Sequence, residues 1–271
     1  MGNCSLKTNR RTVFLDQDGV LNMKSVDQLK IKIFADGADK KGIFEMHQNS
    51  FIRGFTTNPT LMRKAGITDY QDFAIDILKT VKDHPISFEV FSDDFNEMYQ
   101  QAMQIAEWGK NVYVKIPVTN TKGVPAYDLI KKLAQKGVKQ NVTALMTLSQ
   151  VQHVSDALAD GPASCISVFA GRIADTGRDP LPLMVEALNI IRPHSQQELI
   201  WASPRELLNI FQGNAIGCHI ITVTNDILKK LNLVGKDLND YSLETVKMFY
   251  EDATKTGFTK RFIRVSDPLG V

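Results

Sequence analysis

The chain has 271 residues, 43% of them apolar and 23% charged, which allows a sizeable hydrophobic core and excludes a disordered or fibrous protein. Its 32 Lys and Arg side chains nearly balance its 30 Asp and Glu side chains, so we expect no broad surface for nucleic acid. No apolar run approaches the ~20 residues that span a bilayer, and the N-terminus lacks the apolar stretch of a secretion signal. We therefore expect a cytoplasmic protein that binds neither nucleic acid nor membrane.

Residues 1–30 are predicted to form an N-terminal extension that contains one motif. The segment TVFLDQDGVLN at 12–22 resembles the first motif of haloacid-dehalogenase-type phosphatases. In that family the first Asp attacks phosphorus and holds Mg²⁺, and the second transfers the leaving-group proton, roles that would fall to Asp16 and Asp18. The other parts of such a phosphatase are not found in the rest of the chain. A strand followed by an Asp-Gly turn is the simpler interpretation.

Eight short, β-rich apolar runs follow this extension, separated by segments of helical period. They start about 27 residues apart on average, which is the length of one strand, one helix and two loops. The runs begin near Ile31, Gly54, Ile86, Val112, Val138, Ala163, Glu198 and Cys218. This pattern predicts an α/β fold in which residues 31–271 form a single (β/α)8 TIM barrel with an extra C-terminal helix.

The segments between the runs repeat apolar residues at i, i+3 and i+4, and these segments are predicted to be helices that cover the barrel. Clear examples lie at 70–81, 96–108, 148–158 and 181–191. After the eighth run, SLETVKMFYEDAT at 242–254 begins with a Ser-x-x capping pattern, which predicts the C-terminal helix. The three cysteines, Cys4, Cys165 and Cys218, fit neither a disulfide framework nor a zinc site, and the last two are predicted to pack in the core.

Lys115 is the most informative polar residue because it lies inside the apolar run VYVKIPV at 112–118. Apolar side chains around the amine would disfavour its charged form. A neutral amine is a nucleophile for carbonyl groups, so this run indicates a catalytic lysine. A lysine paired with a carboxylate inside the barrel is an equally good interpretation of the run alone.

Further polar residues fall at the other strand ends, where TIM barrels place their catalytic groups. Each of them taken singly is more often a cap, a turn residue or a solvated side chain, so the shared location is what indicates a site. These residues are Asp36, Thr56, Asn58, Glu89, Asn141, Thr143, Ser167, Arg172, Ser203 and Arg205.

Two of these segments resemble signatures of the transaldolase and fructose-6-phosphate aldolase family. GFTTNPT at 54–60 is similar to the family's TTNPS-type motif, and VKIPVT at 114–119 is similar to its Schiff-base lysine segment. The resemblance extends from about residue 31 to residue 263, through FAD at 34–36, NVT at 141–143, SVFAGRI at 167–173 and ASPR at 202–205. It implies a TIM-barrel enzyme that acts on sugar phosphates, needs no metal or other cofactor, and forms a homo-oligomer.

The resemblance also implies a role for each candidate residue. Lys115 would form the carbinolamine and Schiff base with the donor ketose, and Asp36 would be the acid and base at C–C cleavage. Glu89 would position a water together with Thr143 for proton transfer. The remaining candidates would bind substrate, the arginines and Ser203 at its phosphate: Thr56, Asn58, Asn141, Ser167, Phe169, Arg172, Ser203 and Arg205.

Glu89 and Phe169 favour one branch of this family, because aldolase-type members tend to carry Gln and Tyr there. The leading hypothesis is therefore a transaldolase, a transferase of the pentose phosphate pathway that moves a dihydroxyacetone unit between sugar phosphates. A lyase on the same scaffold that releases dihydroxyacetone is the nearest alternative. Alternatives from other classes are a Mg²⁺-dependent phosphatase using Asp16 and Asp18, and a sugar-phosphate-binding barrel without activity. Pro204, where an aromatic residue is common, departs from the family pattern.

Overall fold

The computed structural model describes residues 26–257, so Asp16 and Asp18 of the N-terminal motif lie outside the described residues. The chain divides into two compact units between Leu231 and Asn232. The first unit contains all the barrel strands among the described residues, and the second contains the C-terminal helix. The boundary placed at residue 30 and the single domain placed at 31–271 stay predictions.

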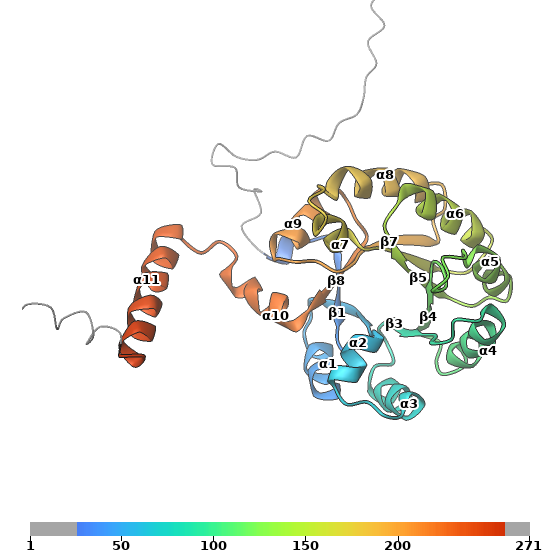
Figure 1. The fold of residues 1–271 in the computed structure, drawn as a ribbon, viewed down its shortest axis with the longest axis horizontal. Coiled ribbons are helices and arrows are strands. Elements are labelled where there is room, and N and C mark those ends of the chain that lie inside the picture. Colours follow the sequence, from blue (N-terminus) through green and yellow to red (C-terminus); the bar gives the residue numbers. More distant parts are fainter. Residues whose placement is uncertain (1–25, 258–271) are drawn as a thin grey trace, which may run out of the picture. The chain divides into compact units, whose positions relative to one another are not determined.

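The first unit is a closed barrel of parallel strands, in which each strand pairs with the next in chain order and the last pairs with the first (Figure 1). Its strands are β1 (Lys32–Asp36), β2 (Ile52–Thr56), β3 (Ile86–Glu89), β4 (Val112–Pro117), β5 (Gln140–Leu145), β6 (Ser164–Val168), β7 (Gln197–Trp201) and β8 (Ile220–Thr224). This topology confirms the predicted TIM barrel.

Helices surround the barrel on its outer face (Figure 1). They are α1 (Lys40–His47), α2 (Pro59–Lys64), α3 (Tyr70–Thr80), α4 (Phe95–Ala106), α5 (Tyr127–Gln135), α6 (Leu148–Leu158), α7 (Ala170–Ala174), α8 (Leu181–Ile191), α9 (Leu208–Ala215) and α10 (Asn225–Leu228). In chain order, the 3₁₀ helix η1 (Val26–Gln28) precedes β1, and the 3₁₀ helix η2 (Lys229–Leu233) follows α10. Side-chain caps fix several helix starts, because Asp39, Asn58, Asp69, Asp94 and Thr147 each accept a hydrogen bond from a backbone N–H of the first turn.

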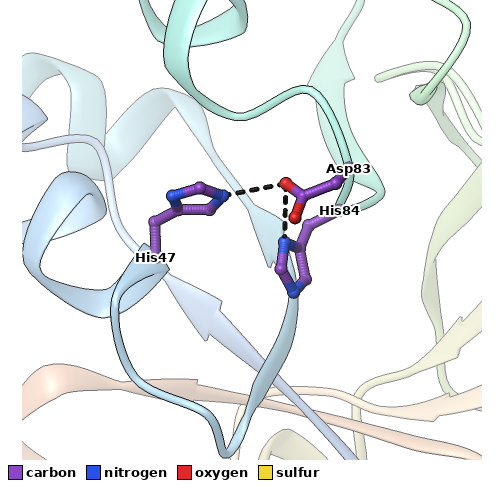
Figure 2. A group of neighbouring side chains, drawn as sticks. All are labelled: His47, Asp83 and His84. Atoms are coloured by element: carbon purple, nitrogen blue, oxygen red, sulfur yellow. Dashed lines mark hydrogen bonds and ion pairs between the residues drawn. The ribbon is translucent and has the colours of Figure 1, made fainter.

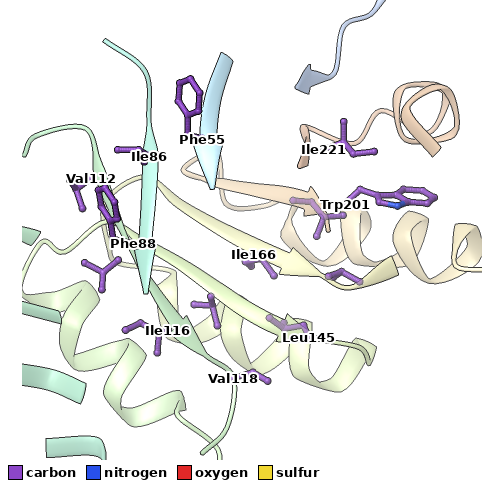
Figure 3. Packing of buried hydrophobic residues seen from close by; sticks show 14 of the residues in the cluster. Phe55, Ile86, Phe88, Val112, Ile116, Val118, Leu145, Ile166, Trp201 and Ile221 are labelled. Carbon is purple, nitrogen blue, oxygen red and sulfur yellow. The ribbon is translucent and has the colours of Figure 1, made fainter. Parts of the chain in front are cut away.

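The strands direct alternate side chains outward, against the helices, and inward, because successive residues of a strand face opposite ways. Figure 3 shows part of the outer cluster, which includes Phe88, Ile116 and Trp201. A second, smaller cluster consists of Phe34, Cys165, Ile200, Ala202 and Ile220. This alternation assigns the smaller cluster to the barrel interior.

Gly54 makes room for the interior cluster. A Cβ atom at this position would lie 2.5 Å from the ring of Phe34, which is closer than carbon atoms can approach. The next residue along β2, Phe55, belongs to the outer cluster. Cys165 and Cys218 are buried with free thiols, which confirms their predicted place in the core.

The C-terminal helix α11 (Leu238–Lys255) begins earlier than the sequence pattern predicts. Asp237 is its N-cap, and its carboxylate accepts hydrogen bonds from the backbone N–H groups of Asn239 and Asp240. A capping carboxylate satisfies these N–H groups, so Ser242 lies inside the helix and the predicted start there is wrong. Among the described residues, α11 included, no helix is both long and apolar enough to cross a membrane.

Candidate active site

The candidate residues gather where the barrel strands end. Asp36, Thr56 and Glu89 are the last residues of β1, β2 and β3. In the sheet register Glu89 lies beside Lys115, and Lys115 lies beside Asn141. Because parallel strands all end at one rim of the barrel, neighbouring strands deliver these groups to one place.

Lys115 is buried, with 7% of its surface exposed, and its amine has two polar partners. Its Nζ donates to the backbone oxygen of Thr57 at 2.9 Å and lies 3.2 Å from Oε2 of Glu89. The amine is therefore not surrounded by apolar side chains alone, and its pairing with a carboxylate inside the barrel is the one that the alternative interpretation of the run predicts. Strand geometry gives the reason, since the flanking Val114 and Ile116 point to the outer cluster while Lys115 faces inward.

Asp36 is partly buried beside this pair and is held by side chains of β2 and the loop after it. Thr56 Oγ1 donates to Oδ1 of Asp36 at 2.7 Å, and Asn58 Nδ2 donates to Oδ2 at 3.4 Å. Thr56 also contacts the hydroxyl of Thr222 on β8. Burial raises the pKa of Asp36, and the positive charge of Lys115 opposes that rise. A carboxyl group with a raised pKa holds its proton up to a higher pH than an ordinary carboxyl group, which suits a residue that takes up and returns a proton.

A buried hydrogen-bonded chain runs from β3 to β6. Asn141 Nδ2 donates to Ser87 Oγ at 3.0 Å, and Ser167 Oγ donates to Asn141 Oδ1 at 2.7 Å. Both ends of the Asn141 amide are therefore fixed in orientation. The amide stands one strand from Lys115, where it can contact a group bound to that amine.

Thr143 lies two residues beyond Asn141 on β5 and has an unusual backbone next to it. The β5–β6 register shifts between Val142 and Leu145, and Ala144 has a φ of 67°, which is strained for a residue other than glycine. The buried Oγ1 of Thr143 has no hydrogen-bond partner among residues 26–257. A β-bulge of this kind re-aims a side chain, and the hydroxyl is left available to a bound group.

The arginine group, which comprises Arg172, Ser203 and Arg205, lies beyond the ends of β6 and β7. Arg205 Nη1 donates to Ser203 Oγ at 3.1 Å, and its Nε donates to Asp175 Oδ1 at 2.9 Å, with Nη2 on the other oxygen. The guanidinium beside Asp175 lowers the pKa of that carboxyl group. The guanidinium carbon of Arg172 lies 5.7 Å from the centre of the Phe169 ring.

Gly171 allows the two halves of the arginine group to approach each other. Ser203 has a φ of 60°, and a Cβ atom at Gly171 would lie 1.5 Å from the Ser203 carbonyl oxygen. Any side chain at position 171 would therefore push Ser203 and the adjacent Arg205 away from α7.

The predicted residues thus form three groups: Lys115 with Glu89 and Asp36, the Asn141 amide chain, and the arginine group. In the described part of the chain no hydrogen bond or ion pair links the arginine group to the other two. Five partners of these groups were not predicted from the sequence: Thr57, Ser87, Asp175, Thr222 and Tyr70, whose hydroxyl bonds to the backbone of Glu89. Strand alternation could have found Ser87, two positions before Glu89, whereas the Thr57 carbonyl and Asp175 depend on loop and helix geometry.

Comparison with known proteins gives concordant matches. Residues 33–262 match the family model described as transaldolase/fructose-6-phosphate aldolase. A "probable transaldolase" of Thermoanaerobacter sp. is 34% identical over 228 residues, covering 84% of this chain and 99% of the relative. One of Methanococcus maripaludis is 31% identical over 219 residues, covering 78% and 97%. The solved 3-keto-L-gulonate-6-phosphate decarboxylase of Vibrio cholerae matches with a TM-score of 0.53 at 11% identity, covering 78% of this chain and 96% of that chain; this last match concerns the fold alone.

Proposed function

Because this chain belongs to the transaldolase/fructose-6-phosphate aldolase family, we propose that it is a transaldolase acting through a Schiff base on Lys115. It moves a dihydroxyacetone unit from a ketose phosphate to an aldose phosphate in the cytoplasm, as a homo-oligomer. The observation that carries the proposal is the buried Lys115 amine, which lies 3.2 Å from the Glu89 carboxylate and close enough to Asp36 for their charges to interact. An amine and two carboxyl groups are what imine formation and proton transfer require.

The reaction begins when the Lys115 amine attacks the ketone carbon of the donor. The carbinolamine loses water and becomes an imine, which draws electrons from the neighbouring C–C bond. Asp36 takes the proton of the hydroxyl group at the far side of that bond, the bond breaks, and the aldose phosphate leaves. The dihydroxyacetone unit remains on Lys115 as an enamine. It attacks the aldehyde carbon of an acceptor while Asp36 returns the proton, and water then releases the product from Lys115.

Proton transfer around the imine falls to Glu89 and Thr143. Carbinolamine dehydration and imine hydrolysis each need a water that is held in place and can exchange a proton. Glu89 is the carboxylate beside the amine, and the unpartnered Thr143 hydroxyl supplies a second contact for that water. Thr56 and Asn58 orient Asp36 and reach the sugar hydroxyls, and the fixed amide of Asn141 with Ser167 holds the dihydroxyacetone part.

The substrate phosphate binds at Arg172, Ser203 and Arg205. Guanidinium groups match the geometry of phosphate oxygens and can donate two parallel hydrogen bonds. Asp175 holds the Arg205 side chain by two contacts in the described structure, so its plane is already set before a phosphate arrives. Phe169 packs against Arg172 and restricts the second guanidinium in the same way.

Transfer rather than release is favoured by two side chains. If the enamine is protonated before an aldehyde arrives, it returns to an imine that water hydrolyses to free dihydroxyacetone, which is the lyase reaction. Glu89 holds its water as a hydrogen-bond acceptor, whereas Gln could present a water that gives up a proton. Phe169 has no hydroxyl to order a hydrolytic water. Glu89→Gln and Phe169→Tyr are therefore expected to increase free dihydroxyacetone release relative to transfer, measured from fructose 6-phosphate with and without erythrose 4-phosphate.

The deciding experiment is reduction with borohydride in the presence of a ketose phosphate, followed by intact mass and peptide mapping. The reduced imine should add one dihydroxyacetone or sugar unit at Lys115, and Lys115→Met should lose both the label and turnover. Lys32→Met is the matched control, because Lys32 is also a strand lysine paired with a carboxylate, Glu198 at 2.6 Å, but at the opposite rim. A label at another lysine, or full turnover in Lys115→Met, contradicts the mechanism. A wild type that releases dihydroxyacetone as fast as it transfers makes it a lyase.

A further inference from the structure

Away from the candidate active site, the side chains of His47, Asp83 and His84 converge (Figure 2). His47 Nε2 lies 2.9 Å and His84 Nδ1 lies 3.0 Å from the same oxygen, Oδ1 of Asp83. The potential ligand atoms of the three residues all lie within 4.8 Å of one another. Two imidazoles and a carboxylate therefore meet at one point, although they come from segments 36 residues apart.

The backbone holds these three side chains in place. His47 is the last residue of α1, and Asp83 and His84 lie in the loop between α3 and β3. The side-chain amide of Asn111 donates to the backbone oxygens of Val81 at 2.9 Å and of His84 at 2.8 Å. The loop is thus fixed on both sides of Asp83, and the three side chains are preorganised.

Ring packing fixes the two imidazoles further. The rings of His47 and His84 meet edge to face at 5.2 Å, and they lie 6.3 and 6.2 Å from the ring of Phe55. Their side chains are only 16% and 21% exposed, whereas that of Asp83 is 66% exposed. The nitrogen donors are therefore oriented by packing, and the carboxylate side is open to an ion from solvent.

We propose that His47, Asp83 and His84 bind a Zn²⁺ ion. Two imidazoles and a carboxylate are a donor set that zinc accepts, with water in the fourth tetrahedral position. Zinc–ligand bonds of about 2.0–2.1 Å separate tetrahedral donor atoms by about 3.3 Å. The hydrogen-bonded pairs at 2.9 and 3.0 Å need to open by only a few tenths of an ångström. Mg²⁺, which prefers an octahedron of oxygen ligands, does not suit this donor set.

The bound ion would tie the end of α1 to the loop that enters β3. His84 lies just before β3, whereas Glu89 is the last residue of that strand, so the zinc site and Lys115 belong to opposite rims of the barrel. The expected consequence is a gain in stability, since a ligand bound only by the folded state raises the free energy of unfolding. The proposal does not depend on the proposed function, because the two sites share no residue.

The test is calorimetric titration of ZnCl₂ into the full-length protein, after EDTA treatment and transfer to chelator-free buffer. Wild type should bind one Zn²⁺ at this site and melt at a higher temperature with zinc. Loss of an outer-shell partner weakens metal sites about 10- to 100-fold, so loss of a ligand in His47→Gln or His84→Gln should weaken binding at least about tenfold. Asp83→Asn changes an exposed side chain and provides a variant that keeps the buried packing.

His153→Gln is the matched control, because His153 is an exposed histidine on α6 outside the cluster. This variant should bind zinc like wild type. MgCl₂ titrated under the same conditions should give no binding at this site. Equal zinc affinity in wild type and in the His47, Asp83 and His84 variants, absence of zinc binding by wild type, or an equal response to MgCl₂ would each overturn the proposal.

Discussion

Asp36 is a single residue of the candidate site whose burial lowers the stability of the folded state. Its carboxyl group is buried, which disfavours the charged form and raises its pKa. The positive charge of Lys115 and the hydrogen bond from Thr56 oppose this effect but do not cancel it. A folded state that raises a carboxyl pKa is destabilised by ionisation of that group at neutral pH.

The pH dependence of stability in Asp36→Asn follows from this shift. The folded wild type binds the Asp36 proton more tightly than the unfolded chain, so it gains stability as pH falls through the raised pKa of the folded state toward the ordinary carboxyl pKa of 3.8. Asn has no such proton but keeps an oxygen for the Thr56 hydroxyl. The difference in the free energy of unfolding, variant minus wild type, should therefore fall over this range. Urea unfolding at a series of pH values measures it.

Asp76→Asn is the control with the opposite sign. Asp76 is a carboxylate whose pKa is lowered by its hydrogen bond from Lys40. Wild type loses the stabilisation of this group as pH falls, so the same difference should rise for Asp76→Asn, by a small amount because the pair is exposed to solvent. A constant or rising difference for Asp36→Asn would contradict the raised pKa. Turnover of Asp36→Asn should fall about 10²- to 10⁴-fold, as for a lost general acid and base.

Among the secondary-structure elements, the contact between α3 and β3 fixes the position of Glu89. The hydroxyl of Tyr70, at the start of α3, accepts a hydrogen bond from the backbone N–H of Glu89 at 2.7 Å and donates to its backbone oxygen at 3.1 Å. Burial raises the pKa of Tyr70, so the hydroxyl keeps the proton that it donates. Glu89 pairs with Lys115 of β4, but the register with β2 ends at Ser87, so the tyrosine hydroxyl supplies two further hydrogen bonds to the backbone at the end of β3.

Tyr70→Phe should loosen the backbone of Glu89, although Tyr70 is not among the residues proposed to bind the substrate. The variant leaves two backbone groups of Glu89 without the tyrosine partner, which costs about 1–3 kcal/mol in the free energy of unfolding for a buried group left unsatisfied. The displaced carboxylate should lower kcat more than it raises KM, because the proposed mechanism assigns proton transfer to Glu89. Urea unfolding and steady-state kinetics measure the two effects.

Tyr99→Phe is the matched control for that change. Tyr99 packs its ring on the outer cluster of the barrel and beneath the amine of Lys132, and its hydroxyl has no hydrogen bond within residues 26–257. It should therefore lose little stability and no turnover. Unchanged kcat in Tyr70→Phe, together with a normal stability, would show that β3 ends correctly without the tyrosine.

Strands and helices whose apolar residues recur at regular spacing were predictable from the sequence, whereas the contacts that loops make were not. The run around Lys115 predicts β4, and strand ends at one rim predict that Asp36, Glu89 and Lys115 meet, because parallel strands share a direction. The partner of the amine, the Thr57 carbonyl, depends on the path of the chain after β2. The bond between Arg205 and Asp175 joins residues 30 positions apart, and no local pattern encodes it.

Because all strands of the barrel run in one direction, the proposed reaction and the proposed zinc site lie at opposite rims. The rim where the strands end carries the amine, the carboxyl groups and the arginines of the proposed reaction. The loop that enters β3 carries Asp83 and His84 of the proposed zinc site. A metal at that rim can change stability without entering the reaction, since its ligands precede the strand whose last residue is Glu89.

The N-terminal motif gives the last prediction, which concerns the chain as a whole. Every side chain with a role in the proposed transfer lies between Asp36 and Arg205, and the imine on Lys115 is the electron sink, so the reaction needs neither Asp16 nor Mg²⁺. A phosphatase that used Asp16 as nucleophile would lose all activity without that carboxylate. Asp16→Asn should therefore transfer dihydroxyacetone at the wild-type rate, with or without EDTA. Asp18→Asn is the matched variant and should behave alike. Phosphate release by wild type that requires Mg²⁺ and disappears in Asp16→Asn would instead assign a second, phosphatase activity to the motif.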